Sequence, residues 1–384
     1  MKRVSDEANA VQVERICISV NTRCNYGCRY CYFYSPENRI SPGQPLRAAD
    51  IRHILEQAFE YHVHHGFFKP VKINFVGSGE PLLNWGEIAE AVSLFWTAHA
   101  DQRRLKFYTV TNGSLITPKI AEEMKSLRII PSVSLDGPKD IHDSHRLLTT
   151  GEGSFEATMK GISALRNAGI GLAINTTLTK VLMLNLTSYL AFVTEQGIEK
   201  VIFNRLVDSP AEIETPSGAD YYNFLTDVAA LAQERKLPGL EIGNLEAYGR
   251  NLSGCPEQVC TLFGSSCGAG TNFLIYMGKD VYPCGRMFGK TEWRLGTHEH
   301  SIEYLQKQMR DRVLESKECL TCKVAVSCVR NCLLDQVSPD YECQSRQDFL
   351  HSFENVVFEG RGGRYDSEHL WHFGCGKDSS MQCY

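Results

Sequence analysis

The residues best able to do chemistry are three cysteines near the N-terminus. Cys24, Cys28 and Cys31 lie within NTRCNYGCRYCYFY, with three residues between the first two and two between the last two. Three thiolates on one short loop can hold three irons of a [4Fe–4S] cube and leave the fourth iron open, as a metal centre that binds substrate requires. A zinc site completed by a distant residue is the alternative, because the spacing alone fits both.

A second group of cysteines lies in the C-terminal third of the chain. Eight thiols are enough for two closed four-cysteine sites, with zinc again as the alternative to iron–sulfur. The chain has fifteen cysteines in tight clusters and no signal peptide, so metal ligation is favoured over disulfides. The eight are Cys260, Cys267, Cys284, Cys319, Cys322, Cys328, Cys332 and Cys343.

Apolar runs with the length and composition of buried strands alternate with amphipathic helical runs. The strand runs are residues 13–21, 71–77, 105–111, 129–135, 171–179 and 200–206. The helical runs are residues 48–65, 85–99, 118–127, 155–168, 186–196 and 219–235. This order predicts an α/β fold with a parallel sheet and right-handed crossovers, either an open doubly wound sheet or a full or partial barrel. The ligand site should lie at the C-terminal ends of the strands.

Local signals mark the ends of several helices. Thr117 and Ser154 precede helical runs and predict N-caps, and Thr117 is followed by a proline at the first helical position. Gly169 and Gly197 stand where two helices should stop. Residues 240–259 show little periodicity and indicate a linker.

The three-cysteine segment resembles the signature of the radical S-adenosylmethionine (SAM) superfamily. The resemblance implies that the open iron binds the amino and carboxylate groups of SAM, and that one electron releases a 5′-deoxyadenosyl radical which abstracts a substrate hydrogen. Tyr30 matches the aromatic position before the third cysteine, whose backbone usually meets the adenine. The fold implied over roughly residues 13–210 is a partial (β/α)6 barrel.

Further matches to that family follow in order at the later strand ends. Gly77-Ser78-Gly79-Glu80-Pro81 resembles the family's Gly-Gly-Glu-Pro motif, with Ser78 replacing a glycine, and Glu80 would accept from the ammonium of SAM. Each later match alone is typical of a turn, but together their order supports the family. The remaining SAM contacts implied by the resemblance are Asn112, Ser134, Asp136, Asn175 and Thr177.

The C-terminal cysteines resemble the SPASM extension of radical SAM peptide-modifying enzymes, which holds two auxiliary [4Fe–4S] clusters. Cys255 competes with Cys260 for the first ligand position. Cys17 is expected to be a buried strand residue, and Cys375 and Cys383 are left over in the tail. By position, one cluster would use Cys260, Cys267, Cys284 and Cys332, and the other would use Cys319, Cys322, Cys328 and Cys343.

The resemblance and the change in composition predict four regions. Residues 1–237 form the radical SAM barrel, 238–259 the linker, 260–345 the SPASM domain and 346–384 a C-terminal helix and tail. One helix is expected near 300–313.

Composition limits the partners. The net charge of −5 gives no reason to expect nucleic acid, and no apolar run approaches the ~18 residues that cross a bilayer. The polar N-terminus lacks the core of a signal peptide, so a cytoplasmic protein is expected. We also expect a reducing donor such as flavodoxin or ferredoxin.

Among the functions that the family carries, oxidative modification of a ribosomally made (RiPP) peptide is the leading expectation. Formylglycine-forming sulfatase maturases carry an aspartate after the cysteine matching Cys284, whereas this chain has Gly285. Many of these enzymes carry an extra peptide-binding domain before the barrel, but only 23 residues precede Cys24 here. The precursor peptide is therefore expected to dock on the barrel mouth and SPASM region, or to be presented by a separate recognition protein. The alternatives are a sulfatase maturase, a small-molecule dehydrogenase and a non-catalytic zinc-stabilised module.

Overall fold

The structure, a computed structural model, divides into two compact units that are described separately. The first unit comprises residues 1–134, 146–172 and 268–314, and the second comprises 135–145, 173–267 and 315–384. The residues that the structure describes are 10–34, 45–99, 103–210, 212–234, 239–252, 258–259, 266–310 and 345–353.

The first unit is built on a sheet whose central strands are parallel. Strands β1 (Arg15–Ser19), β2 (Val71–Phe75), β3 (Leu105–Thr111) and β4 (Ile129–Ser134) pair in chain order. On its other side β1 pairs in parallel with β10 (Phe273–Met277). The antiparallel strands β11 (Asp280–Tyr282) and β12 (Gly296–Thr297) follow β10. A segment from the C-terminal third of the sequence therefore extends the sheet begun by β1.

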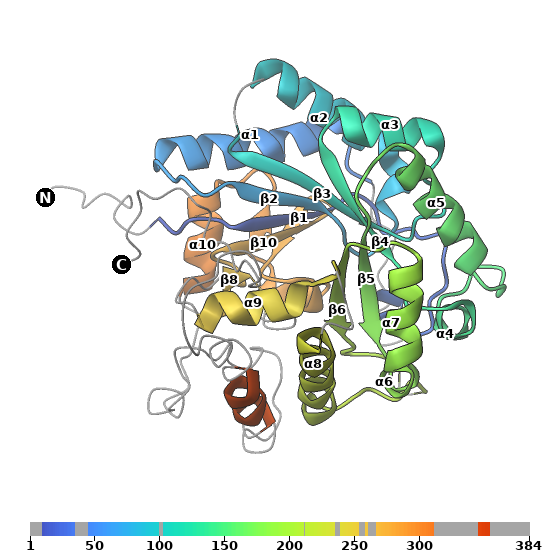
Figure 1. Ribbon diagram of the computed structural model, residues 1–384. Helices are drawn as coiled ribbons and strands as arrows, with labels where there is room; N and C mark the ends of the chain where they lie inside the picture. Colours follow the sequence, from blue (N-terminus) through green and yellow to red (C-terminus); the bar gives the residue numbers. More distant parts are fainter. Residues whose placement is uncertain are drawn as a thin grey trace, which may run out of the picture. The chain divides into compact units, whose positions relative to one another are not determined.

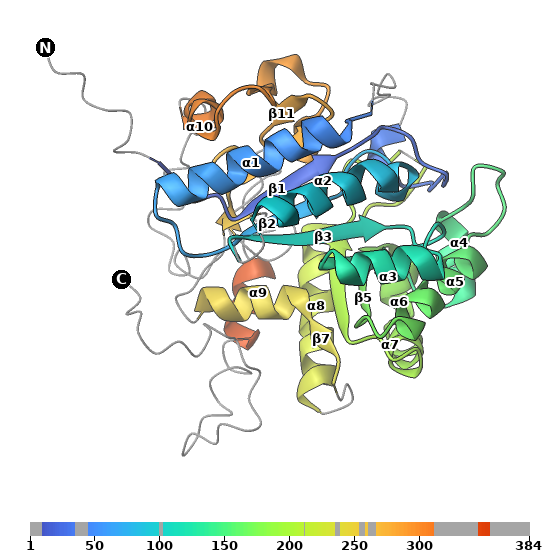
Figure 2. The same cartoon turned by 90° about the horizontal axis from the view of Figure 1, so that it is seen from above.

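Helices cover one face of this sheet. Figure 1 shows α1 (Ala48–His64) and α2 (Trp85–Ala98) along β1–β3, and Figure 2 shows the same two helices from above. Strand β3 alternates between buried and more exposed residues, so that Phe107 packs on Phe95 of α2. The other helices of the unit are α3 (Pro118–Ser126), α5 (Phe155–Asn167) and α10 (Ile302–Arg310), with short 3-10 turns η2 (Tyr32–Tyr34), η4 (Pro81–Asn84), η6 (Gly285–Met287) and η7 (Thr291–Trp293).

In the second unit, β5 (Ala173–Leu178), β6 (Lys200–Arg205) and β7 (Glu241–Ile242) pair in parallel in chain order. A separate pair is formed by β8 (Gln258–Val259) and β9 (Ser266–Cys267). Its core is rich in aromatic side chains, including the fully buried Tyr189, Phe203 and Tyr221. The helices are α4 (Lys139–His145), α6 (Lys180–Leu184), α7 (Leu186–Glu195), α8 (Gly218–Gln233) and α9 (Gly243–Leu252), and residues 345–353 are also helical.

The predicted α/β class with a parallel sheet is confirmed, and each predicted strand and helix is present within a few residues of its expected ends. The Thr117 hydroxyl accepts from the Ile120 N–H at 3.2 Å, as an N-cap should. Gly169 and Gly197 end their helices with φ of 71° and 60°, a conformation that glycine adopts without strain. No helix among the described residues combines the length and apolar character needed to cross a membrane.

Two local expectations were wrong. Ser154 does not cap α5, because its hydroxyl donates to the Arg146 carbonyl at 2.8 Å. The segment expected to be a linker contains α9, which a long-range contact holds in place. Asn244 of α9 accepts from the Phe203 N–H at 2.8 Å and donates to the Phe203 carbonyl at 2.9 Å. Such pairing with β6 leaves no trace in local periodicity. The predicted domain boundaries stay a prediction.

Candidate active site

The loop that carries Cys24, Cys28 and Cys31 directly follows β1, and all three cysteines are partly buried. A backbone hydrogen bond holds the loop against the segment around Leu147. The Gly27 N–H donates to the Leu147 carbonyl at 2.8 Å. The Tyr26 N–H lies 3.4 Å from the Cys24 sulfur. Such a donor favours a thiolate, as cluster ligation needs.

Burial nonetheless raises the pKa of Cys24 to about 11, so its proton must leave when a metal binds. Among the described residues, no three Cys, His, Asp or Glu side chains surround one point as a single metal ion would need. Three thiols within eight residues are instead the donor set of a cluster that leaves one iron open, so the residues present fit a [4Fe–4S] group.

A buried carboxylate lies beside this loop. Glu80 is 3% exposed and accepts from the Thr111 hydroxyl at 2.6 Å, the Asn112 N–H at 2.8 Å and the Leu82 N–H at 3.1 Å. Burial raises the pKa of Glu80, and the three hydrogen bonds oppose that rise. No Lys or Arg in the described part of the chain forms an ion pair with it. A buried carboxylate held in this way is suited to a small cation such as an ammonium group.

The glycines before Glu80 allow β2 to approach the cysteine loop closely. A side chain at Gly77 would overlap Ser19, and one at Gly79 would overlap the Asn21 side chain and the Arg23 backbone. The Glu80 N–H then donates to the Arg23 carbonyl at 2.8 Å. The two glycines therefore allow the segment after β2 to contact the segment after β1 closely.

Asn21 is a site residue that sequence reasoning missed. Its Nδ2 donates to the Glu80 carbonyl at 2.9 Å, and its Oδ1 accepts from the Arg23 N–H at 2.8 Å. Ser19 supports the same junction, because its hydroxyl lies 3.2 Å from that of Ser78. Asn21 thus joins the loop that bears Cys24 to the loop that bears Glu80. An asparagine three residues before a cysteine carried no signal of this role.

Tyr30 also has a neighbour that sequence reasoning missed. The Arg146 guanidinium lies 5.4 Å from the centre of the Tyr30 ring, and both side chains are buried, at 8% and 7% exposure. A buried cation on an aromatic face fixes the ring more firmly than apolar packing alone. Arg146 lies far from the cysteines in the sequence, so spacing could not reveal the contact.

In the second unit, Asp136 contacts the end of β5. Its Oδ1 accepts from the Thr177 N–H at 2.9 Å, and its own N–H donates to Nδ1 of the buried His142 at 3.3 Å. Asn175 accepts from the Asn204 side chain at 3.4 Å. His142 and Asn204 had not been singled out from the sequence. Ser134 is the last residue of β4 in the first unit.

Only two of the predicted auxiliary ligands fall in the described part of the chain. Cys267 ends β9 in the second unit, and Cys284 precedes η6 in the first. A Cβ placed on Gly285 would lie 2.8 Å from the Tyr32 hydroxyl oxygen, so Tyr32 fills the space beside Cys284. The predicted ligands outside the described residues are Cys260, Cys319, Cys322, Cys328, Cys332 and Cys343, as are Cys255, Cys375 and Cys383.

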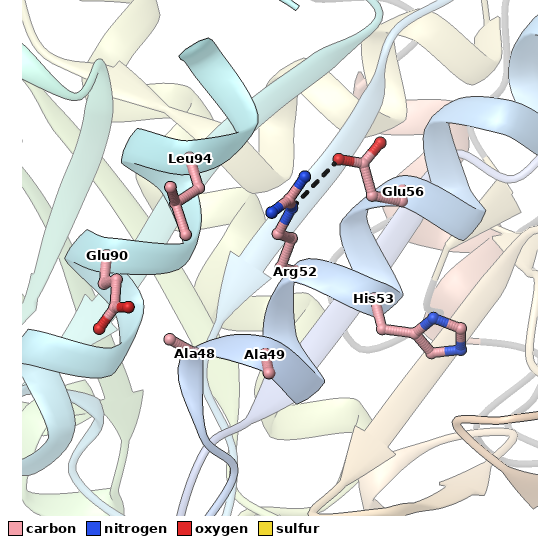
Figure 3. Close-up of a pocket in the computed structure, with 7 residues that line it drawn as sticks. All are labelled: Ala48, Ala49, Arg52, His53, Glu56, Glu90 and Leu94. Carbon is pink, nitrogen blue, oxygen red and sulfur yellow. Dashed lines mark ion pairs between the residues drawn. The ribbon is translucent and has the colours of Figure 1, made fainter. Parts of the chain in front are cut away.

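A hollow of the described surface lies away from these residues. A cavity of about 350 Å³ lies between α1 and α2, on the outer helical layer of the first unit (Figure 3). It contains the Arg52–Glu56 ion pair at 3.5 Å, with Glu90 and Leu94 opposite. A narrower crevice between the ends of β1 and β2 is lined by Ser19, Asn21, Gly77 and Gly79, among others. The cysteines and the buried carboxylate therefore point to the strand ends, whereas none of the predicted site residues lines the hollow between α1 and α2.

Comparison with known proteins finds relatives that cover much of the chain. A cysteine-type anaerobic sulfatase-maturating enzyme of Clostridium perfringens is 24% identical over 362 residues, which are 87% of this chain and 94% of that enzyme. The radical SAM cyclopropyl synthase TigE of Paramaledivibacter caminithermalis is 29% identical over 187 residues. That match covers 47% of this chain and 38% of TigE, so the chain spans well under half of that relative.

Solved structures share the fold at lower identity. The structure of native anSMEcpe with bound AdoMet gives a TM-score of 0.71 at 19% identity, covering 89% of this chain and 98% of that one. Streptococcus suis SuiB bound to its precursor peptide SuiA gives 0.64 at 18% identity, covering 88% and 77%. Residues 18–187 match the family described as the radical SAM superfamily, and this range includes the cysteine loop, Glu80 and Asp136. The chain therefore carries a radical SAM domain.

Proposed function

We propose that the protein is a radical SAM maturase that oxidatively modifies a side chain of a ribosomally made peptide. The observation that carries the proposal is the junction of the three-cysteine loop with the buried Glu80. Asn21 and the Arg23 backbone hold the two together at the ends of β1 and β2. A cluster bound there would supply the electron that cleaves SAM.

The residues of the first unit have distinct tasks in this proposal. Cys24, Cys28 and Cys31 would hold the cluster, and Glu80 would receive the ammonium of SAM. Tyr30, fixed by Arg146, would border the adenine. Ser134, Asp136 and Asn175 stay predictions from the family resemblance, as do the auxiliary clusters on the C-terminal cysteines.

A peptide substrate is supported by solved relatives. SuiB was solved with its precursor peptide, and anSMEcpe was solved with the peptide Cp18Cys. Relatives named as sulfatase-maturating enzymes also favour a second candidate, the maturation of a sulfatase. Gly285 and its contact with Tyr32 count against that candidate, because no proton-accepting side chain fits after Cys284 unless Tyr32 moves.

The test begins with anaerobic reconstitution, iron counting and an assay for 5′-deoxyadenosine after addition of SAM and dithionite. We expect about twelve irons per chain and SAM cleavage. Changing Cys24, Cys28 and Cys31 together to Ala should abolish cleavage and leave about eight irons. The matched control is Cys17→Ala, which removes a buried thiol of β1 outside the loop. This variant should keep both SAM cleavage and the iron content of the unchanged protein.

The substrate class is tested by mass spectrometry on two peptides. One is a short peptide encoded beside this chain's gene, and the other is a sulfatase peptide with its target cysteine. A mass loss in the gene-neighbour peptide alone supports the peptide maturase. A mass loss in the sulfatase peptide alone refutes that proposal and supports a sulfatase maturase. Tightly bound zinc without 5′-deoxyadenosine would refute both. Flavodoxin or ferredoxin should replace dithionite as the donor.

A further inference from the structure

Every polar atom of the Asn112 side chain already has a partner. Its Nδ2 donates to Asn25 Oδ1 at 2.8 Å and lies 4.0 Å from the Cys24 sulfur. Its Oδ1 accepts from the Ser114 N–H at 3.0 Å and from the Ser114 hydroxyl at 2.7 Å. An amide has two N–H donors and two lone pairs, so these four contacts use its full capacity. Asn112 is also 6% exposed, which leaves little surface for a ligand.

The backbone of Asn112 is engaged in the same way. Its N–H donates to Glu80 Oε2 at 2.8 Å. Its carbonyl accepts from the Thr158 hydroxyl at 3.0 Å, and that hydroxyl lies 2.9 Å from the hydroxyl of Tyr26 in the cysteine loop. One residue at the end of β3 therefore touches the cysteine loop through its side chain and the buried carboxylate through its backbone.

A closed ring of hydrogen bonds holds the side chain in place. Asn25 accepts from Asn112 through Oδ1 and donates through Nδ2 to the Ser114 hydroxyl at 2.8 Å. Ser114 donates back to Asn112. Such a ring fixes which end of each amide is the donor, because reversing either amide would oppose two donors or two acceptors. The N–H near Cys24 therefore has a defined direction.

We propose that Asn112 is a positioning residue, which fixes the first cluster thiolate relative to the carboxylate of Glu80 and donates to that thiolate. The inference rests on the proposed function and assigns Asn112 a role other than the SAM contact expected from the sequence. Hydrogen bonds to cluster sulfurs tune the cluster, and partners behind metal ligands commonly contribute about 10–100-fold in metal affinity. The effect of Asn112 should therefore be present before SAM binds.

The test is Asn112→Asp, which keeps the backbone contact with Glu80 and the acceptor of Ser114 but removes both N–H donors. In the SAM-free reduced protein, the electron paramagnetic resonance signal that responds to SAM should change. Iron from that cluster should be lost to a chelator about 10–100-fold more readily. The SAM dissociation constant of protein that retains the cluster should stay within about threefold. The matched control is Asn185→Asp, the same change at an exposed helix junction of the second unit, which should change none of these.

The opposite pattern would overturn the inference: an unchanged SAM-free signal together with weaker SAM binding would make Asn112 a direct contact. If Asn112→Asp does not fold, Ser114→Ala opens the same ring while leaving the Asn112 side chain present. Ser114→Ala should shift the signal in the same direction by a smaller amount, and an unshifted signal would refute the ring's role. Failure of the wild-type protein to form the cluster would instead refute the proposed function.

Discussion

Replacing Glu80 with glutamine changes the charge of one buried group while keeping its size. If the carboxylate receives the ammonium of SAM, Glu80→Gln removes a charge-assisted hydrogen bond with a net value of about 1.5–3 kcal/mol. At about 1.4 kcal/mol per tenfold, the SAM dissociation constant should rise by about 10- to 150-fold.

The same change disturbs the protein around the side chain. All three contacts of the carboxylate are donors: the Thr111 hydroxyl, the Leu82 N–H and the Asn112 N–H. The Thr111 hydroxyl and the Leu82 N–H share Oε1, whereas the Asn112 N–H has Oε2 to itself. If the new NH2 group takes the place of Oε1, the Thr111 hydroxyl can rotate and accept from it, but the Leu82 N–H loses its acceptor. A buried donor left in this way costs about 1–3 kcal/mol, which chemical denaturation would measure as a lower free energy of unfolding.

The pH dependence has a defined sign. Burial raises the pKa of Glu80 in the folded protein above the ordinary glutamate value of about 4.3, so the folded state holds the proton more tightly than the unfolded state. The contribution of Glu80 to stability is therefore present below that ordinary value and is lost as pH rises through the folded pKa. A cationic ligand favours the ionised form, so SAM should bind more tightly as pH rises through the same window.

Isothermal titration of SAM into the reconstituted protein at several pH values tests both effects. Glu80→Gln should weaken binding and flatten its pH dependence. The matched control is Glu90→Gln, the same change on the exposed face of α2 in the same unit, which should alter neither. Unchanged affinity in Glu80→Gln, with the cluster intact, would show that the carboxylate does not receive SAM.

Three further changes test contacts that the structure reveals. Gly285→Ala places a Cβ 2.8 Å from the Tyr32 hydroxyl and should lower the free energy of unfolding by about 1–3 kcal/mol, and Tyr32→Phe should restore most of it in the double variant. Asn244→Ala leaves the buried N–H and carbonyl of Phe203 unpaired and should cost about 2–4 kcal/mol in urea unfolding. His62 is buried, which lowers its pKa to about 4, so its contribution to stability is lost as pH falls from about 6.5 towards 4. His62→Phe should reduce the loss in free energy of unfolding over that pH range by up to about 3 kcal/mol.

Each of these changes has a control in the same chain. Gly86→Ala adds a methyl group where nothing lies within 4 Å, Asn185→Ala removes an exposed amide, and His64→Phe alters an exposed neighbour of His62. A double variant no more stable than Gly285→Ala would show that Tyr32 is not the obstacle. An Asn244→Ala cost equal to that of Asn185→Ala would remove the argument for anchoring of α9. A pH slope unchanged in His62→Phe would assign acid sensitivity to other groups.

The strands and most helices could be predicted from the sequence because their signals are local. Strand β1 is apolar on both faces, as a central parallel strand must be, and Thr117 caps its helix through contacts within three residues. Helix α9 was missed because Gly243 and Gly249 weaken its local signal, and its anchor at Asn244 pairs with a strand about forty residues earlier.

The candidate site divides in the same way. The three cysteines were singled out from residue type and spacing, and Glu80 from the resemblance of its segment to a family motif. Asn21 and Arg146 were missed because their contacts depend on which loops meet after folding. Gly79 was noticed as part of a motif, but its close contact with Asn21 also depends on which loops meet after folding.

The pairing of β1 with β10 has a consequence during synthesis. Residues 15–19 pair with residues 273–277, so the first strand to be synthesised cannot pair on that side until the chain has grown past β10. At about 5–20 residues per second, roughly 260 intervening residues take about 13–50 s to translate. Throughout that interval one hydrogen-bonding edge of an apolar strand is open, and open edges recruit other strands. A growing or truncated chain that ends before β10 should therefore depend on chaperones and aggregate readily when they are scarce.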